Sequence, residues 1–159
     1  MEYLSEMIRP LTWAGIGTAI LCGGAIGLER QLRGKAAGMR TSILICLGTQ
    51  VFIELAASFP SDHVDPTRVL GQVVTGIGFL GAGVILAQGG VVTGVTTAAV
   101  VWVLAAIGSV SGLGHYGAAM LLALFTLGVL LGIEFLENTF RRLRRGVNVG
   151  APDRKGDGS

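Results

Sequence analysis

Residues 116–136 read YGAAMLLALFTLGVLLGIEFL, and this stretch decides the class of protein. A helix rises about 1.5 Å per residue, so about 20 apolar residues are needed to cross the roughly 30 Å hydrocarbon layer of a bilayer. The stretch meets that length, and its single charged side chain, Glu134, lies close to its end. We therefore predict a membrane-spanning helix here.

Four further apolar stretches precede it, at residues 11–28, 41–59, 69–87 and 95–113. Together they predict an all-α polytopic membrane protein with about five transmembrane helices, glycine-rich packing and no soluble domain. Hydrophobic residues make up 51% of the chain and charged residues only 14%, whereas a soluble domain carries roughly 25% charge. We therefore expect most of the surface to face the lipid bilayer.

The charges predict the orientation. Cationic residues gather in the first loop and after the last stretch, and such residues favour the cytoplasmic side; they are Arg30, Arg33, Lys35 and Arg40, then Arg141, Arg142, Arg144 and Arg145. We expect an external or interfacial segment at 1–10, a transmembrane domain at 11–140, and a cytoplasmic tail at 141–159 that is first basic and then, from residue 146, disordered. The N-terminus is then outside.

Several classes of function are disfavoured. The chain has no basic stripe interleaved with aromatic residues, so we expect no nucleic-acid partner. We find no pairing of a nucleophile with a base and no cofactor-binding lysine, so we expect no catalytic residues, no enzyme activity and no cofactor. His63 and His115 are isolated loop histidines and are interpreted as incidental.

Glycines form two kinds of pattern. The string from Gly76 to Gly81 matches GxGxxG, but it lies inside an apolar stretch without the strand–helix context of a dinucleotide site. We interpret it as close packing or as a local break in the helix. GxxxG pairs occur at Gly23/Gly27, Gly108/Gly112 and Gly128/Gly132 and predict helix packing, with dimerisation as an alternative for the last pair.

Glu54 is the other acidic side chain inside an apolar stretch, and Gln50 lies one turn before it. An intramembrane carboxylate should face protein or a water-filled cavity. It is therefore part of an ion or proton path, a partner in a satisfied interhelical hydrogen bond, or a protonated side chain near the outer interface.

The sequence Asp65-Pro66-Thr67-Arg68 has the pattern of a helix start, with Asp65 as the cap and Arg68 paired with Asp65 or Asp62. The functional alternative is an outward-facing Mg²⁺ site formed by Asp62 and Asp65, because Mg²⁺ prefers oxygen ligands. Two aspartates do not establish such a site, so whether Mg²⁺ binds stays open.

Two charged dipeptides are expected to meet at the cytoplasmic surface. Glu29-Arg30 ends the first stretch and Arg40-Thr41 opens the second. They are interpreted either as interfacial anchors or as a platform that contacts a partner or gates a cavity.

Three ordered motifs carry a resemblance to a known family. The first is Gly27-Leu-Glu-Arg-Gln followed by Gly34-Lys-Ala-Ala-Gly-Met-Arg-Thr41, the second is Asp65-Pro-Thr-Arg68 with residues 72–86, and the third is Gly94-Val-Thr-Thr-Ala-Ala99 with Trp102. These resemble the signatures of the MgtC/SapB membrane family over residues 11–136. The motif residues selected as functional are Glu29, Arg30, Gly38, Arg40, Thr41, Asp65, Pro66, Arg68, Gln72, Gly76, Gly78, Gly81, Gly83, Thr96 and Thr97.

The resemblance implies a multi-pass protein of the bacterial inner membrane, linked to growth or survival at low Mg²⁺ and, in pathogens, inside macrophages. It also implies a non-transporting regulator that acts on the F-type ATP synthase in the type protein, and self-association as a homodimer or higher oligomer is expected. Longer members carry a soluble ACT-like domain after the membrane part, and residues 146–159 are not expected to form one, so functions of that domain are not carried over. The alternative function is a transporter or channel for Mg²⁺ or another cation that uses Asp65 and Glu54, with a helix break at Gly76–Gly83 lining the cavity.

Overall fold

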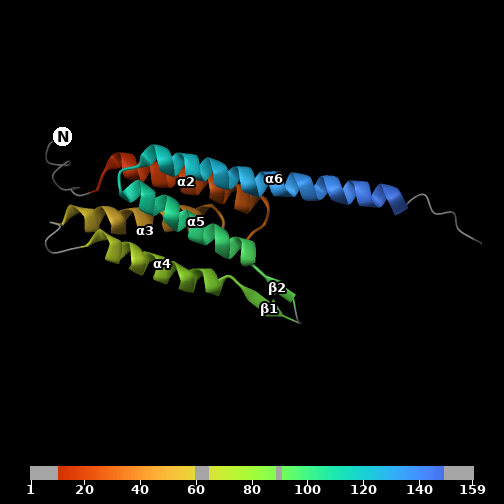
Figure 1. Ribbon diagram of the computed structural model, residues 1–159, viewed down its shortest axis with the longest axis horizontal. Helices are drawn as coiled ribbons and strands as arrows, with labels where there is room; N and C mark the ends of the chain where they lie inside the picture. Colours follow the sequence, from red (N-terminus) through yellow and green to blue (C-terminus); the bar gives the residue numbers. More distant parts are fainter. Residues whose placement is uncertain (1–10, 60–64, 89–90, 149–159) are drawn as a thin grey trace, which may run out of the picture. The chain divides into compact units, whose positions relative to one another are not determined.

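The computed structural model describes residues 11–59, 65–88 and 91–148. The elements, in chain order, are α2 (Trp13–Leu32), α3 (Met39–Ser58), α4 (Pro66–Gly83), β1 (Leu86–Gln88), β2 (Val91–Thr93), α5 (Val95–Gly112) and α6 (Tyr116–Asn148) (Figure 1). The chain divides into one unit up to Thr126 and a second from Leu127. The all-α class is confirmed, and each expected apolar stretch corresponds to a helix.

Three of the described helices are long and apolar enough to cross a membrane: α3, α5 and the part of α6 from Tyr116 to Ile133. The other two carry polar residues that lower their mean hydropathy, Glu29 and Arg30 in α2 and Arg68 and Gln72 in α4. A membrane protein is thus confirmed, and the span assignment of α2 and α4 stays a prediction.

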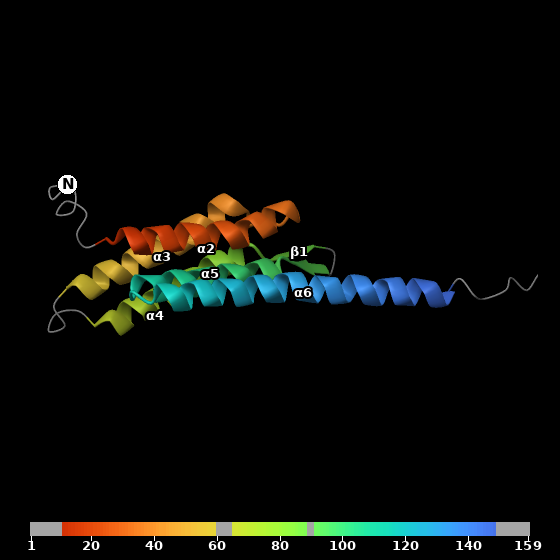
Figure 2. The same cartoon turned by 90° about the horizontal axis from the view of Figure 1, so that it is seen from above.

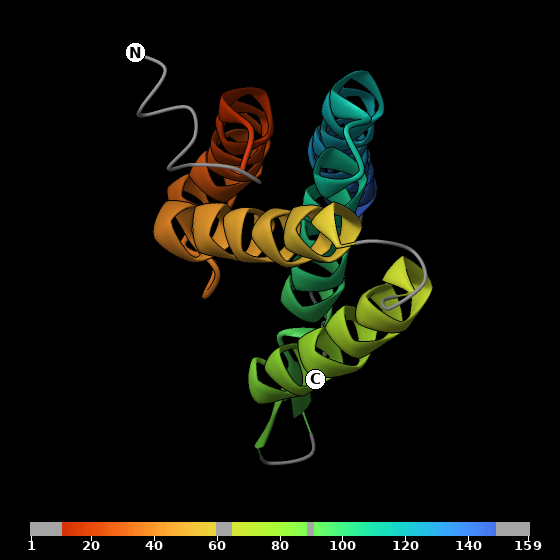
Figure 3. The ribbon, with the colours of Figure 1, turned by 90° about the vertical axis from the view of Figure 1, so that its left-hand side faces the viewer.

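The core of the first unit forms where α3 packs against both α2 and α5 (Figure 3). Its fully buried apolar side chains come from all three helices and include Ile26, Ile53, Leu104 and Ile107. Away from this core many large apolar side chains are exposed, for example Leu21, which is 67% exposed. Such a surface suits lipid rather than water.

Glycines set the distance between these helices. A Cβ added at Gly27 would lie 2.6 Å from the Met39 Cα, and one at Gly112 would lie 2.6 Å from the Gln50 carbonyl oxygen. The GxxxG prediction of helix packing is therefore confirmed for Gly23/Gly27 and Gly108/Gly112. A Cβ at Gly128 or Gly132 would meet no atom within 4 Å.

The connection between α4 and α5 differs from the prediction. The apolar pattern predicts no helix for residues 88–94, between the third and fourth apolar stretches, but Leu86–Gln88 pairs antiparallel with Val91–Thr93 in a short ribbon (Figure 2). The third helix also ends at Gly83, four residues before the expected residue 87. The β-branched residues of the second strand favour the extended conformation. After it Gly94 has φ +87°, and a Cβ there would overlap the Val84 carbonyl oxygen, so this position requires glycine.

Of the two interpretations of the Gly76–Gly81 string, the local break is not observed, since α4 is continuous from Pro66 to Gly83. Helix α6 continues through the basic run to Asn148, so it includes the first three residues of the segment expected to be disordered. The expectations for residues 1–10, for Asp62 and His63, and for 149–159 lie outside the described residues.

Candidate functional site

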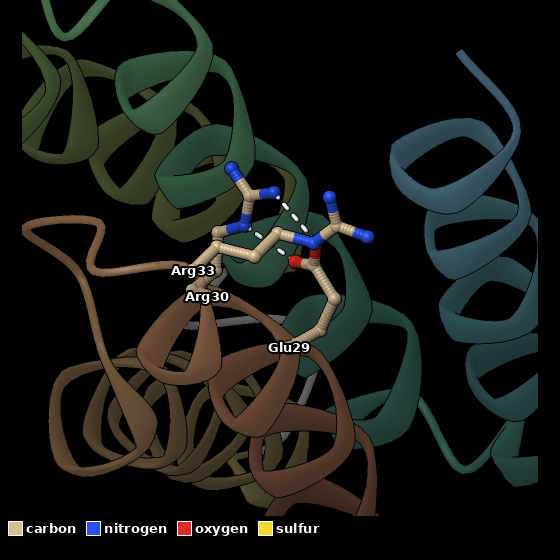
Figure 4. A network of polar contacts seen from close by, with 3 residues as sticks. All are labelled: Glu29, Arg30 and Arg33. Carbon is tan, nitrogen blue, oxygen red and sulfur yellow. Dashed lines mark hydrogen bonds and ion pairs between the residues drawn. The ribbon is translucent and has the colours of Figure 1, made fainter. Parts of the chain in front are cut away.

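One end of α2 carries a cluster of charges, here called the arginine cluster, in which Glu29 and Arg30 are buried and Arg33 is half-buried (Figure 4). The Glu29 carboxylate accepts from Arg30 Nε at 2.5 Å and from Arg30 Nη2 at 2.8 Å, and it forms an ion pair with Arg33 Nε at 2.5 Å. Arg30 is only 3% exposed and Glu29 only 8%. Because a buried charge is unfavourable unless it is paired, the shared carboxylate is what allows Arg30 to be buried.

Arg33 was not selected from the sequence, although its spacing of four residues from Glu29 is a known helical pairing signal. Arg40 and Thr41, expected to meet Glu29 and Arg30, are exposed on the first turn of α3. Gly38 is the N-cap of α3, and the adjoining Met39 N–H donates to the side chain of Gln31 at 3.4 Å. Among the described residues Arg40 forms no ion pair with Glu29, so the buried ion pair lies on α2 alone, and a platform that includes Arg40 and Thr41 stays a prediction.

The other end of α2 carries a second group, here called the amide–carboxylate cluster: Thr12, Gln50, Glu54 and Tyr116. Glu54 Oε1 accepts from the Thr12 backbone N–H at 2.8 Å, and Glu54 Oε2 accepts from Gln50 Nε2. Thr12 Oγ1 lies 2.9 Å from the Tyr116 hydroxyl. The carboxylate therefore lies at the N-terminus of α2, where the helix dipole favours negative charge.

This geometry agrees with the hydrogen-bonded interpretation of Glu54, because its two oxygens have interhelical and intrahelical partners. A role of Glu54 in an ion or proton path stays a prediction. Gln50 is fully buried, and its Oε1 has no hydrogen-bond partner among the described residues. Nearby, Ser111 Oγ donates to the Gly15 carbonyl at 3.3 Å. The participation of Thr12 and Tyr116 has no signal in the sequence, since tertiary folding alone brings residues 12, 54 and 116 together.

Asp65 is confirmed as a helix cap. Its carboxylate accepts from the Thr67 backbone N–H at 2.9 Å and from the Thr67 hydroxyl at 2.7 Å. The Thr67 hydroxyl, then its N–H, and then the nearby Arg68 charge hold the pKa of Asp65 below its ordinary value. Pro66 occupies the first turn, as expected. The described residues include no group of three His, Cys, Asp or Glu side chains suited to a metal.

The remaining motif residues divide between exposed and packed positions. Arg68, Gln72 and Thr96 are exposed, whereas Thr97 is buried at the start of α5. Among the α4 glycines, Gly81 faces Ala98 at 3.8 Å, whereas a Cβ at any of the others would meet nothing within 4 Å; these are Gly71, Gly76, Gly78 and Gly83. Close packing is therefore not the role of most α4 glycines within this chain.

A groove of about 100 Å³ lies between α4 and α5. Its lining is almost wholly apolar and includes Ile77 and Trp102. Neither Glu54, Gln72 nor Asp65 contributes to it. The groove suits hydrocarbon, and the hydroxyl in its lining, Ser109 Oγ, already donates to the Ala105 carbonyl at 2.9 Å.

The three signature motifs therefore occur on a packed helical bundle with a buried ion cluster at one end of α2. The model of the MgtC family matches residues 16–139, which is most of the chain. The chain belongs to the MgtC family.

MgtC-family relatives agree with this assignment. The chain is 46% identical over 138 residues to the "Putative magnesium transporter YhiD" of Escherichia coli K12, covering 82% of the chain and 63% of that protein. It is 42% identical to "Protein MgtC" of Brucella abortus, covering 87% and 60%, and 39% identical to "Protein SapB" of Bacillus subtilis, covering 88% and 62%. The chain thus spans less than two thirds of each relative. No solved structure matches it.

Proposed function

We propose that this chain is a non-enzymatic protein of the bacterial inner membrane that supports adaptation to low Mg²⁺ by regulating a membrane partner. Following the family resemblance, the partner to test is the F-type ATP synthase. The N-terminus is proposed to lie outside and the C-terminus in the cytoplasm, as the cationic loops predict.

The observation that carries the proposal is the closed packing of α2, α3 and α5. Gly108 and Gly112 bring α5 against α3 so closely that a Cβ at Gly108 would overlap Thr49 and the Cys46 carbonyl. The buried hydroxyls of Thr49 and Ser109 donate to carbonyls of their own helices. A transport path needs polar groups that are free to bind an ion, and these two hydroxyls are already engaged. Among the described residues, Ser42 Oγ and Gln50 Oε1 are the buried side-chain atoms without a partner.

Cation transport is the second candidate, and the printed name of the Escherichia coli relative favours it. On this alternative Glu54 and Asp65 would bind the ion. Both carboxylates, however, accept hydrogen bonds from backbone N–H groups at helix N-termini, which is the geometry of a structural cap.

Mg²⁺ flux into proteoliposomes separates the two candidates. We expect no flux above that of empty liposomes from folded protein, and no change in the variants Glu54→Gln and Asp65→Asn. Saturable flux that is lost in either variant would establish a transporter and reject regulation as the primary activity.

The partner is tested in inverted membrane vesicles that contain the F-type ATP synthase. We expect the chain to change ATP-driven proton pumping, measured by quenching of a pH-sensitive dye. The matched control is Gly108→Leu, which should disrupt the bundle. Equal proton pumping in vesicles with the intact chain, with the Gly108→Leu variant and without the chain would exclude the F-type ATP synthase as a partner.

A further inference from the structure

Helix α4 carries a stripe that no other described part of the first unit covers. The stripe consists of Asp65, Arg68, Gln72, Thr75, Phe79 and Ala82, at alternating spacings of three and four residues. This spacing places them on one helix face. All six residues are exposed, and Phe79 is 82% exposed. The opposite face, with Val73, Ile77 and Gly81, packs toward α5.

The stripe has the wrong chemistry for contact with lipid alone. Gln72 lies seven residues beyond Asp65, which is about 10 Å further along the helix. Its side-chain amide is exposed and has no hydrogen-bond partner among the described residues. An amide without a partner in hydrocarbon is strongly unfavourable, whereas one paired across two helices stabilises their association. The neighbouring Thr75 differs, because its hydroxyl already donates to the Gly71 carbonyl at 2.9 Å.

We propose that this stripe is the surface on which a second copy of the chain docks, with two α4 helices packed in parallel about a twofold axis. A twofold interface brings a residue near the axis against its own copy. A primary amide carries both a donor and an acceptor, so Gln72 is complementary to itself. A polar residue at one such position also fixes the register of paired helices.

The charges at the start of the stripe favour a second copy over an unrelated helix. Asp65 and Arg68 are three residues apart and exposed, and among the described residues neither forms an ion pair. In a parallel twofold pair each Asp65 lies three residues, about 4.5 Å along the axis, from the level of Arg68 in the other copy, which the long arginine side chain can span. The single stripe therefore supplies both halves of two ion pairs. At the other end, Phe79 supplies the large apolar contact, and Gly71 and Gly78 leave room for close approach.

Disulfide cross-linking of the purified full chain in liposomes tests the interface. Single cysteines are introduced as Gln72→Cys, Thr75→Cys and Phe79→Cys, and oxidation is expected to give a dimer on a non-reducing gel. The control is Leu44→Cys, which is 66% exposed on α3 and should stay monomeric. The unaltered chain is a second control, because Cys22 and Cys46 are both buried. No dimer at any stripe position, or equal dimer at residue 44, would overturn the proposal.

A charge exchange tests the orientation of the pair. In the Thr75→Cys background, Arg68→Glu places like charges together and should lower the dimer yield several-fold. Adding Asp65→Lys restores opposite charges and should recover the yield. Recovery of the dimer yield would support the parallel arrangement, even though Asp65→Lys also removes the helix cap. If the dimer yield does not recover, although the cysteine of the variant still reacts normally with maleimide, the parallel arrangement is ruled out.

Discussion

Gly108 of α5 and Gly76 of α4 both lie inside helices of this glycine-rich chain, yet their surroundings are opposite. A methyl group added at Gly108 would overlap Thr49 and the Cys46 carbonyl, whereas one added at Gly76 would meet no atom within 4 Å. The same contrast holds for polar groups, since Gln50 is buried beside Glu54 while Gln72 is exposed. The bundle of α2, α3 and α5 is thus complete within one chain, and α4 is not.

The largest expected effect is at Gly108. Replacement by alanine should force α3 and α5 apart, with a loss of more than about 3 kcal/mol, because the contacts include backbone that cannot move aside. The yield of monodisperse protein in detergent and its thermal unfolding midpoint measure the effect. Gly76→Ala is the matched control and should be neutral or stabilising by up to about 1 kcal/mol. Equal losses of stability in Gly108→Ala and Gly76→Ala would show that the surroundings of α5 and α4 do not differ in this way.

The arginine cluster should be the next most sensitive site. Glu29→Gln leaves two guanidinium groups without their shared carboxylate and should destabilise the protein by about 3–5 kcal/mol. Arg33→Gln should have a smaller effect, because the Arg30–Glu29 pair remains. The unfolding midpoints of the two variants are measured in lipid nanodiscs. The decisive result is which variant has the lower midpoint, and we expect this to be Glu29→Gln. A larger loss in Arg33→Gln would show that Glu29 is not the centre of the cluster.

A smaller contrast separates two glycines with positive φ. Gly94 has φ +87° and lies against the Val84 carbonyl, whereas Gly114 has φ +82° and open space around it. Alanine at Gly114 should cost about 1–2 kcal/mol of backbone strain. Alanine at Gly94 adds a steric overlap, so it should lower the unfolding midpoint more. Equal unfolding midpoints for the two variants would mean that the backbone around Val84 moves to accept the added methyl group at no cost in stability.

The smallest effect concerns Asp65 and pH. Because Thr67 holds the pKa of Asp65 below its ordinary value, the carboxylate stabilises the folded state above that ordinary pKa, about 3.9. This stabilisation is lost as the pH falls through the lowered pKa. The unfolding midpoint of the protein should therefore exceed that of Asp65→Ala at neutral pH and approach it in acid. Asp65→Asn, which can still cap α4, should show less dependence on pH than the unaltered chain.

Much of the fold could be predicted because it depends on local patterns. The apolar stretches predicted α2, α3, α4 and α5 to within about four residues, whereas α6 continues to Asn148, well beyond the expected end at residue 136. Asp65-Pro66 correctly marked the start of α4. The ribbon after α4 was missed because Leu86–Gln88 continues an apolar run, and periodicity does not distinguish a short buried strand from a helix end. The GxGxxG string suggested a break that is absent, since glycine permits but does not impose a bend.

The sequence by itself determined that this chain is a helical membrane protein of the MgtC family, because apolar length and signature motifs are properties of continuous segments. It did not determine which glycines are packed, which of two glutamines is buried, or that Thr12, Glu54 and Tyr116 come together. Those outcomes depend on which helices become neighbours. Only tertiary packing decides which helices become neighbours. It brings residues that are distant in the chain into one interior without water, where polar groups that lack a partner are unfavourable.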